Sequence, residues 1–384
     1  MNPTAKYDLI IIGAGPAGMS AAKIVANSSL KVLILDEQAQ AGGQIYRNVM
    51  QSDNNREYLG RYYFAGTRLV RNMQSSNINT QFNASVWKVE ETGNVYYTVN
   101  GRVFEAVGKF IIIAIGAQER PCPFPGWTLP GVMTCGAAQI MMKSSRLIPS
   151  NAILAGSGPL IYLLAAQMLD AGKPPLALVE TQPKLLPLKA LFHIPAALKG
   201  WQTLINGVAL LAKIQRAGIK RYVHATEFSA IQKYSGKLQF NFKHNGQQHQ
   251  IESQTLLVHQ GIIPNTHLTR SANIQHCWHE IQRNWYPKVN EWGRTNINKI
   301  LIAGDGAKIG GADIAMQQGH LAGLEILQLS NQIDEKTKNT RAKLYQKKLK
   351  TAFAPRALLD RIYATPKAFR VPIDKTIICR CEEI

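Results

Sequence analysis

The chain has 384 residues, of which 46% are hydrophobic and 18% charged, and this excludes a disordered protein and predicts two or three folded domains. Its 44 Lys and Arg residues against 24 Asp and Glu residues give a formal charge of +20, which raises nucleic acid and anionic membranes as partners. Nucleic-acid recognition is not expected, because the basic residues are scattered and no aromatic platform accompanies them. The densest basic cluster, residues 336–350, predicts a solvated helix face or a dock for an acidic partner.

Two segments bear on where the protein resides. Residues 1–7 run directly into a hydrophobic strand without the basic and apolar regions of a secretion signal, so we expect a cytoplasmic protein. The longest apolar stretches, such as residues 160–169, fall short of the ~18 residues that a bilayer span needs. No transmembrane segment is therefore expected, and these stretches are predicted to be buried helices.

The first predicted element is a dinucleotide-binding βαβ unit. A hydrophobic strand at residues 8–12 runs into Gly-x-Gly-x-x-Gly, and the next hydrophobic strand, residues 31–36, ends in an acid. The first glycine allows a tight turn, the second lets the backbone approach a pyrophosphate, and the third lets helix and strand pack closely. The acid would accept hydrogen bonds from ribose hydroxyls. The residues expected to bind nucleotide here are Gly13, Ala14, Gly15, Pro16, Ala17, Gly18, Asp36 and Glu37.

Two further glycine-bearing segments favour FAD over NAD at this site. The paired glycines in residues 41–45 can bring the backbone against the phosphate and ribityl chain of a flavin. A hydrophobic strand at residues 299–305 ends in Gly-Asp and leads to a helix at residues 312–318, whose dipole can face the flavin. Between them, residues 108–117 form another buried strand that ends in glycine. The additional residues expected to bind FAD are Gly42, Gly43, Gln44, Val86, Ala114, Gly116, Gly304, Asp305, Gly311 and Ala312.

A second βαβ start at residues 151–161 is an internal repeat of the first. Gly156 and Gly158 fill the first two glycine positions, and Glu180 ends a later strand. The third glycine position holds Ile161, so helix and strand cannot pack as closely and a nicotinamide dinucleotide would bind poorly or differently. An adenine nucleotide in a structural role and an empty architectural domain are two alternatives that the sequence leaves open.

The five cysteines form no Cys-x-x-Cys pair, which argues against a flavin-linked disulfide reductase. Cys379 and Cys381 form a Cys-x-Cys pair at the end of a predicted strand, half of the ligand set of an iron–sulfur cluster. Four ligands are required. A [2Fe-2S] cluster is therefore expected only if the missing ligands are supplied elsewhere.

These elements predict an α/β protein with two Rossmann-like dinucleotide-binding domains. The FAD-binding domain is split in sequence, residues 1–130 and 290–328, and a second, NAD(P)-like Rossmann domain, residues 131–289, is inserted into it. Residues 329–384 form a short C-terminal extension that leads into the incomplete [2Fe-2S]-type segment. A Pro- and Gly-rich stretch, residues 120–131, cannot form a regular helix or strand and marks the junction.

With these residues in view, the chain resembles the A subunits of opine oxidases and the related subunits of hydrogen cyanide synthase and of hydroxyproline or proline dehydrogenases. These are FAD-dependent flavoproteins of the pyridine nucleotide-disulfide oxidoreductase type. The missing third glycine at Ile161 is shared with that family's pattern, whereas Ile115 replaces a threonine that is usual there. The segments that carry the resemblance are residues 116–121, 123–134, 155–159, 259–266, 292–295, 303–306 and 379–383.

The resemblance implies an FAD-dependent oxidoreductase that acts on CH–NH donors as one subunit of a hetero-oligomeric opine or amino-acid oxidase or dehydrogenase. A partner flavoprotein subunit would take the hydride from a secondary amine, and this subunit would pass the electrons onward. The family normally continues beyond Cys-x-Cys-Glu-Glu into a small domain that completes a [2Fe-2S] site, whereas this sequence ends at Ile384. Because the cofactor carries the redox change, no catalytic acid or base is assigned.

Two other functions are alternatives. The chain would be a stand-alone NAD(P)H-dependent flavin or ferredoxin-type reductase if the second Rossmann unit bound a nicotinamide nucleotide, which Ile161 argues against. It would be a non-catalytic scaffold if it held FAD only to stabilise a partner.

Overall fold

The computed structural model describes residues 5–51, 54–73, 75–185, 187–373, 376–379 and 382. The α/β fold class with two Rossmann-like halves is confirmed, and the chain divides into two compact units. Unit 1 comprises Met1–Asn55, Arg61–Gln118 and Ile263–Phe353, and unit 2 comprises Arg56–Gly60, Glu119–Ile262 and Ala354–Ile384. The functional domain boundaries predicted from the sequence stay a prediction.

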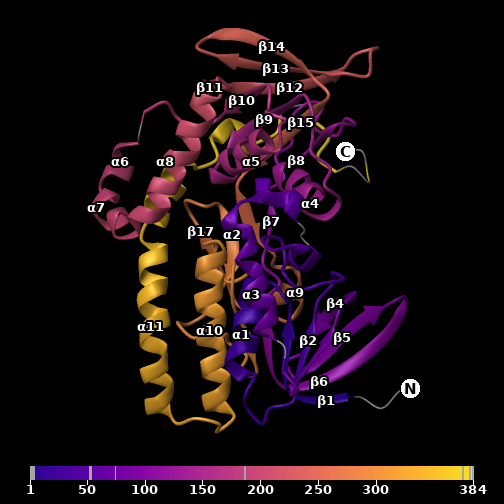
Figure 1. Ribbon diagram of the computed structural model, residues 1–384, viewed down its shortest axis with the longest axis vertical. Helices are drawn as coiled ribbons and strands as arrows, with labels where there is room; N and C mark the ends of the chain where they lie inside the picture. Colours follow the sequence, from indigo (N-terminus) through magenta and orange to yellow (C-terminus); the bar gives the residue numbers. More distant parts are fainter. Residues whose placement is uncertain are drawn as a thin grey trace. The chain divides into compact units, whose positions relative to one another are not determined.

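A mixed sheet forms the centre of unit 1 (Figure 1). Its parallel strands lie in the order β3, β2, β1, β6, with β19 paired to the last residues of β6, while β5 and β4 continue the sheet antiparallel from the first half of β6. Runs of Ile, Leu and Val are buried in the parallel strands, as is typical where both faces of a sheet are covered. The strands are β1 (Ala5–Ile12), β2 (Val32–Leu35), β3 (Ile78–Gln81), β4 (Ala84–Val89), β5 (Asn94–Val99), β6 (Arg102–Ile113) and β19 (Ile300–Ile302).

Small residues hold two helices of unit 1 close together. A Cβ atom on Gly319 of α10 would lie 2.1 Å from the carbonyl oxygen of Ala17 in α1, and one on Gly323 would lie 3.0 Å from the carbonyl oxygen of Ala21. The residue numbers of the two contacting pairs, Ala17 with Gly319 and Ala21 with Gly323, increase in the same direction, so α1 and α10 run parallel. Unit 1 contains α1 (Pro16–Val25), α2 (Arg61–Phe64), α3 (Gly66–Arg71), α9 (His267–Ser271), α10 (Ala312–Leu329) and α11 (Glu335–Phe353), with the hairpin of β17 (His276–His279) and β18 (Asn284–Pro287).

Helix α11 returns antiparallel beside α10 (Figure 1). Lys338 donates to Glu325 at 2.8 Å, and the ring of Tyr345 stacks on His320 with centroids 4.3 Å apart. The buried carboxylate of Glu325 also forms an ion pair with Arg294, whose Nε lies 3.1 Å away. Helix α10 extends beyond the predicted residues 312–318, and its contacts with α11 reach at least as far as Glu325.

A five-stranded parallel sheet, in the order β11, β10, β9, β15, β8, forms the centre of unit 2. A three-stranded antiparallel sheet, β12, β13, β14, belongs to the same unit. The strands are β8 (Val132–Thr134), β9 (Ala152–Ser157), β10 (Ala177–Glu180), β11 (Lys220–Val223), β12 (Thr226–Gln232), β13 (Leu238–His244), β14 (Gln247–Ser253) and β15 (Thr255–Gln260). The helices are α4 (Cys135–Ser145), α5 (Pro159–Asp170), α6 (Leu188–Leu191), α7 (Ile194–Ala197), α8 (Trp201–Arg216) and α12 (Arg356–Ile362).

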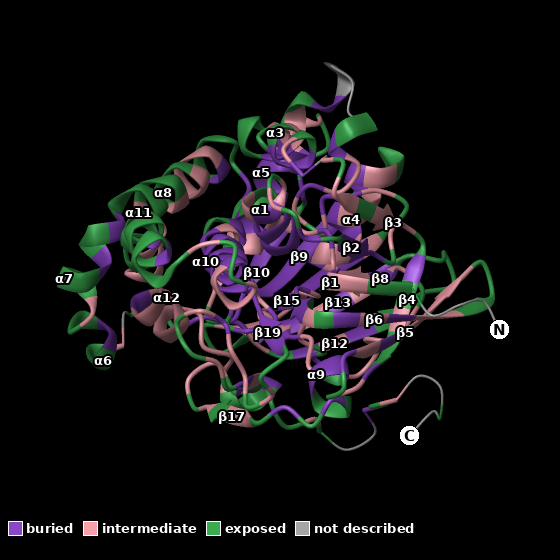
Figure 2. Cartoon of the chain, turned by 90° about the horizontal axis from the view of Figure 1, so that it is seen from below, coloured by how far each residue is buried: buried purple, intermediate pink, exposed green. Residues whose placement is uncertain are grey.

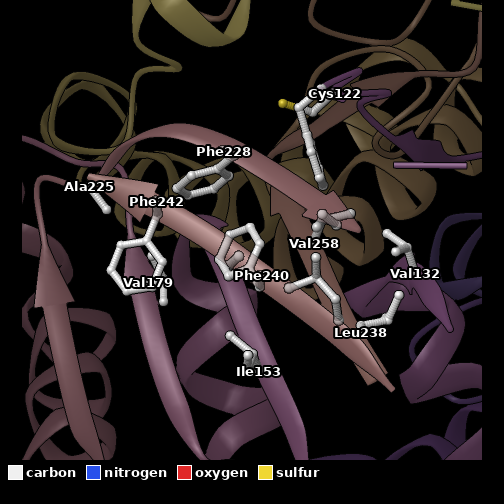
Figure 3. Packing of buried hydrophobic residues seen from close by; sticks show 14 of the residues in the cluster. Cys122, Val132, Ile153, Val179, Ala225, Phe228, Leu238, Phe240, Phe242 and Val258 are labelled. Atoms are coloured by element: carbon white, nitrogen blue, oxygen red, sulfur yellow. The ribbon is translucent and has the colours of Figure 1, made fainter. Parts of the chain in front are cut away.

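Successive residues of β9 belong to two different apolar clusters. Ile153 packs in the cluster that contains Phe228, Phe240 and Phe242 of the antiparallel sheet (Figure 3). Its neighbour Leu154 packs in the cluster that contains α4, α5 and the end of α8. This alternation is the two-residue period of a strand that is covered on both faces. The antiparallel sheet thus covers one face of the parallel sheet, and the helices cover the other.

The chain passes from unit 1 to unit 2 within β7 (Ala117–Glu119) and returns within β16 (Ile262–Pro264). Within the described part of the chain, every helix is too short or too polar to cross a membrane.

Candidate functional site

The candidate site lies at the carboxyl edge of the unit 1 sheet. Four neighbouring parallel strands, β1, β2, β6 and β19, end there. The residues that follow them are Gly13, Asp36 and Ala114, and Gly304 lies two residues beyond β19. Their ends are joined by backbone hydrogen bonds, since the Gly13 N–H donates to the carbonyl oxygen of Leu35 at 2.7 Å and the Ala114 N–H donates to that of Ile12 at 2.7 Å. Ligands of open α/β sheets bind outside this edge. The structure therefore brings four separately predicted segments to one place.

The glycine turn after β1 is closed tightly. Gly13 has a φ of +103°, and a Cβ there would lie 2.5 Å from the carbonyl oxygen of Ala114. A Cβ on Gly18 would lie 1.9 Å from the carbonyl oxygen of Gly13, so only glycine permits this contact between helix and strand. The paired-glycine loop lies against the same turn, because a Cβ on Gly43 would be 2.9 Å from the Cα of Gly15. The predicted tight turn at Gly13 and the close packing at Gly18 are thus geometric necessities here, whereas the approach of Gly43 to a flavin stays a prediction.

The turn after β19 touches the same region from the other side. A Cβ on Gly304 would lie 2.9 Å from the Cβ of Ala17, and one on Gly306 would lie 3.2 Å from the carbonyl oxygen of Gly116. Gly304 and Gly116 both have positive φ angles, +83° and +69°. The turns after β1, β6 and β19 therefore form one continuous backbone surface.

Two helix N-termini point to this edge. Helices α1 and α10 start after Gly15 and Gly311, and neither has a capping side chain. The helices run parallel, and Ala17, the second residue of α1, lies beside Gly319, the eighth residue of α10. Helix α10 therefore begins six residues earlier along the shared direction, which is about 9 Å at about 1.5 Å per residue. Open space surrounds the Cβ position of Gly311. Uncapped N–H groups and the helix dipole make both ends suitable for negative charge.

Two aspartates hold the turns in place. Asp36 is buried and accepts hydrogen bonds from the backbone N–H groups of Ala14 at 2.5 Å and Gln38 at 2.8 Å. Burial raises the pKa of the Asp36 carboxyl, although these two hydrogen bonds oppose the shift. Asp305 accepts from the backbone N–H groups of Gly310 at 2.8 Å and Gly311 at 2.9 Å, and so fixes the entry to α10.

The remaining predicted FAD residues lie around these turns with less defined roles. Glu37 is exposed and accepts from the Gln38 side chain at 3.0 Å, and the exposed Gln44 accepts from Arg47 at 3.2 Å. Val86 lies on β4 and packs against the apolar cluster of the unit 1 sheet, two residues beyond Ala84, whose N–H donates to the carbonyl oxygen of Asp36. Pro16 and Ala312 occupy the first turns of α1 and α10.

A tyrosine pair beside α10 was missed by the sequence analysis. The hydroxyl of Tyr62 donates to the Asp313 carboxylate at 3.0 Å, in the first turn of α10, and its ring lies 6.2 Å from that of the buried Tyr46. Burial raises the pKa of Tyr46, and partial burial together with the neighbouring Asp313 carboxylate raises that of the half-exposed Tyr62, so both phenols stay protonated at neutral pH. No local pattern identifies this group, because its three members lie far apart in the sequence.

In unit 2 the repeat of the glycine turn is also closed tightly. A Cβ on Gly156 would lie 1.7 Å from the carbonyl oxygen of His259, and one on Gly158 would lie 3.2 Å from the His259 ring. His259 is buried and its Nδ1 lies 2.6 Å from a carboxylate oxygen of Glu119. Ile161, at the third glycine position, is buried in α5. The turn is therefore packed by side chains of its own unit.

The acid at the end of β10 is fully engaged with protein donors. Glu180 has no exposed surface. Its carboxylate accepts from Arg221 through Nε at 2.6 Å and Nη2 at 2.9 Å, from the Tyr162 hydroxyl at 2.6 Å, and from the Gln182 amide. A ribose could reach Glu180 only by displacing these donors. This arrangement supports a structural role for the residue.

The cysteines show no redox pair among the described residues. Cys122 and Cys135 are buried, and burial raises the pKa of both thiols, that of Cys122 to about 12. Cys379 is described and partly exposed, whereas Cys381 lies outside the described residues, so the predicted half-site of a cluster is not seen as a whole. In the described ranges, no three His, Cys, Asp or Glu side chains form a group that could hold a metal ion.

Residues 7–319 match the family model of pyridine nucleotide-disulphide oxidoreductases, and the chain belongs to this family of oxidoreductases. More particularly, it is 38% identical to the A subunit of opine oxidase from Rhizobium meliloti (strain 1021), over 98% of this chain and 82% of that protein. It is 30% identical to hydrogen cyanide synthase subunit HcnB of Pseudomonas protegens (strain DSM 19095 / LMG 27888 / CFBP 6595 / CHA0), over 97% of this chain and 81% of that protein. The predicted resemblance is confirmed.

Among solved structures, the fold is similar to that of L-proline dehydrogenase from P. horikoshii, with a TM-score of 0.62. The match covers 90% of this chain and 59% of that chain, at 17% sequence identity. At this identity the likeness shows the shared fold alone.

Proposed function

We propose that this chain is the FAD-binding subunit of a complex that oxidises a secondary amine, an opine or an amino acid, and that it relays electrons from a partner flavoprotein subunit. The names of the relatives, the A subunit of opine oxidase and hydrogen cyanide synthase subunit HcnB, support a role as one subunit of a complex. The observation that carries the proposal is the meeting of three glycine-rich turns and two uncapped helix N-termini at the carboxyl edge of one sheet.

The residues of this edge fit FAD. The turn from Gly13 to Gly18 and the N-terminus of α1 would hold the pyrophosphate, and Gly43 provides close backbone approach without a side-chain clash. Asp36 would accept from the ribose, since each carboxylate oxygen can accept a second hydrogen bond. Asp305 would face the ribityl or phosphate part of the cofactor from the turn after β19. Val86, Ala114 and Gly116 would line the site.

When bound, FAD supplies the acceptance and release of electrons. The N-terminus of α10 would stabilise negative charge at the flavin end of the site through the N–H groups of its first turn and its dipole, because Gly311 offers no capping side chain and leaves open space at its Cβ position. The Gly311 N–H itself is engaged by Asp305. Asp313 would moderate this effect, since its carboxylate is in the same turn and accepts from Tyr62. The protein's part is thus to position and to tune, and we assign it no acid or base in the reaction.

We propose further that the amine substrate binds to the partner subunit, and that a [2Fe-2S] cluster at Cys379 and Cys381 forms only if two more ligands come from elsewhere. Three alternatives remain. A stand-alone NAD(P)H-dependent reductase is disfavoured by the engagement of Glu180 and by Ile161 at the third glycine position. An adenine nucleotide held for structural reasons would need only Gly156, Gly158 and the N-terminus of α5. A non-catalytic FAD scaffold would need the unit 1 site alone.

The test is a visible spectrum of the purified chain, followed by separate anaerobic additions of NADH, NADPH, octopine and proline, with and without the partner subunit. Bleaching of a flavin band by an amine only when the partner is present is the expected result. Bleaching by NADH or NADPH without the partner would establish the reductase instead. A flavin band that no donor bleaches, even with the partner, would favour the scaffold.

A matched pair of variants locates the flavin. Gly43→Ala places a Cβ 2.9 Å from the Cα of Gly15 at a φ of +58°, whereas Gly101→Ala, at a φ of +75°, meets no atom within 4 Å. Both introduce comparable backbone strain, but only the first intrudes on the proposed site. We expect bound flavin per chain to fall at least five-fold in Gly43→Ala and to stay unchanged in Gly101→Ala. Equal flavin content in both would contradict the assignment.

A further inference from the structure

The side chain of Arg47 lies between two of the segments proposed to bind FAD. Its Nη1 donates to the side-chain oxygen of Gln38, two residues after Asp36. Its Nη2 donates to the side-chain oxygen of Gln44 at 3.2 Å, next to Gly43. Strand β2, which leads to Asp36, is coloured as buried in Figure 2, whereas Gln38 and Arg47 are partly exposed. The guanidinium therefore links the end of β2 to the paired-glycine loop.

The backbone that carries this side chain is fixed. The Tyr63 hydroxyl donates to the carbonyl oxygen of Arg47 at 2.7 Å. The preceding residue, Tyr46, is buried, and its N–H donates to the carbonyl oxygen of Gly42 at 3.1 Å. A Cβ on Gly66 would lie 2.3 Å from the Tyr46 ring, so α3 packs closely on this residue. Arg47 thus extends from a rigid turn that directly follows the paired glycines.

The guanidinium of Arg47 is held by neutral acceptors only. Both hydrogen bonds go to amide oxygens, and within the described part of the chain Arg47 forms no ion pair. A guanidinium has five N–H donors, and these two bonds use two of them. The Nε of Arg47 is buried and has no hydrogen-bond partner among the described residues. A buried N–H without an acceptor destabilises the fold, so this donor calls for a partner that the chain does not supply.

The neighbouring acids are directed to other donors. Asp36 accepts from the backbone N–H groups of Ala14 and Gln38, and Glu37 accepts from the Gln38 side chain at 3.0 Å. The charge of Arg47 reaches Asp36 through space, since it opposes the rise that burial causes in the pKa of that carboxyl. The positive charge of Arg47 is therefore oriented by the two amides but is not neutralised by them.

We infer that Arg47 binds the pyrophosphate of FAD and that Gln38 and Gln44 orient its guanidinium for this contact. The paired-glycine loop lies against the turn proposed to hold the pyrophosphate, because a Cβ on Gly43 would be 2.9 Å from the Cα of Gly15. A guanidinium presents adjacent N–H groups that match two phosphate oxygens. Arg47 would thus add a charged side-chain donor to the backbone N–H groups of α1. This inference rests on the proposed FAD function.

A structural bracket that only ties Gln38 to Gln44 is the competing explanation. It needs the two Nη groups of Arg47 and leaves the buried Nε without a purpose. The two explanations predict different losses. Removal of a bracket lowers the stability of the flavin-free chain, whereas removal of a phosphate ligand weakens FAD binding and reduces its dependence on salt.

The test is the dissociation constant of FAD from the full-length chain, measured by the fluorescence of released flavin. We expect Arg47→Met to weaken binding at least ten-fold, with a smaller fall in affinity on raising salt than in the wild type. Arg47→Lys should recover only part of the loss, because lysine keeps the charge but lacks the planar fork. Arg102→Met, which removes an exposed arginine at the start of β6, should bind FAD normally. Unchanged affinity in Arg47→Met, with a lower unfolding midpoint of the flavin-free chain, would make the residue a bracket and overturn the inference.

ADP locates the contact on the pyrophosphate, because it carries the diphosphate but no flavin. Its binding is measured by displacement of FAD, so that only the shared site is counted. Arg47→Met should weaken ADP and FAD by the same factor. Weaker FAD binding with unchanged ADP binding would place Arg47 at the flavin end and overturn the assignment. A wild-type chain that binds no FAD contradicts the proposed function itself, whereas equal FAD affinity in the wild type and Arg47→Met contradicts this inference alone.

Discussion

The contact between α1 and α10 gives a sharp test of how the proposed FAD site is built. In Gly319→Ala the added Cβ would lie 2.1 Å from the carbonyl oxygen of Ala17, more than an ångström inside normal contact, so the helices must separate. Overpacking of this kind costs about 1–3 kcal/mol, and the gain in helix propensity offsets about 1 kcal/mol of it. The net loss of up to about 2 kcal/mol lowers the unfolding midpoint of a unit of this size by up to about 8 °C.

The matched control is Gly207→Ala in α8, where the added Cβ meets no atom within 4 Å. The same gain in propensity then acts alone and should raise the midpoint by about 2–4 °C. Thermal unfolding followed by circular dichroism, together with flavin bound per chain, measures both variants. We expect Gly319→Ala also to lose flavin, because separation of the helices moves the N-termini of α1 and α10 relative to each other. If both variants gain stability and keep their flavin, the close contact is not a requirement of the site.

Two further outcomes follow from buried groups. His320 stacks on Tyr345 near Lys23 and Lys348, and burial lowers its pKa from 6.5 to about 4. Between these pH values the unfolded chain binds a proton that the folded chain does not. The free energy of unfolding therefore decreases as the pH is lowered from 6.5 to 4, by at most about 1.4 kcal/mol per pH unit. Chemical denaturation from pH 7 to pH 4 should show a shallower loss for His320→Phe, and identical slopes would refute this. Burial raises the pKa of Cys122 to about 12, so Ellman's reagent at pH 8 should label this thiol only when the protein unfolds. The native wild type and the Cys122→Ala variant should then show the same number of labelled thiols. An immediate difference of one thiol between them would contradict this.

The sequence was sufficient to locate the backbone of the unit 1 site. Gly13, Gly18 and Gly304 occupy positions where a Cβ would collide or where φ is positive, and such requirements are written locally in glycine. Runs of Ile, Leu and Val mark the strands that end at this edge, because buried parallel strands are rich in these residues. That these residues bind a cofactor stays a prediction.

Side-chain partnerships were beyond the reach of sequence reasoning. Glu180 occupies the position of a ribose-binding acid, yet its carboxylate is held by Arg221, 41 residues away, and by Tyr162 on α5. The exposure of Trp201 could not be predicted from the sequence either, since an apolar stripe on a helix does not reveal whether another element covers it. Both depend on which strands become neighbours, and this is decided only when the sheet assembles.

Unit 1 is built from separate segments of the chain, and their order along the sequence determines when its parts can assemble during synthesis. Strand β19 and helix α10 complete the edge that β1 and α1 begin, but roughly 290 residues separate them, which is about 15–60 s of translation at about 5–20 residues per second. The intervening residues from Glu119 to Ile262 supply most of unit 2 and can fold first. Until Gly304 emerges from the ribosome, the hydrophobic strand β6 lacks one neighbour, and the half-built sheet offers an open edge to chaperones or to aggregation. We therefore expect the proposed FAD to bind only after β19 and α10 have been synthesised.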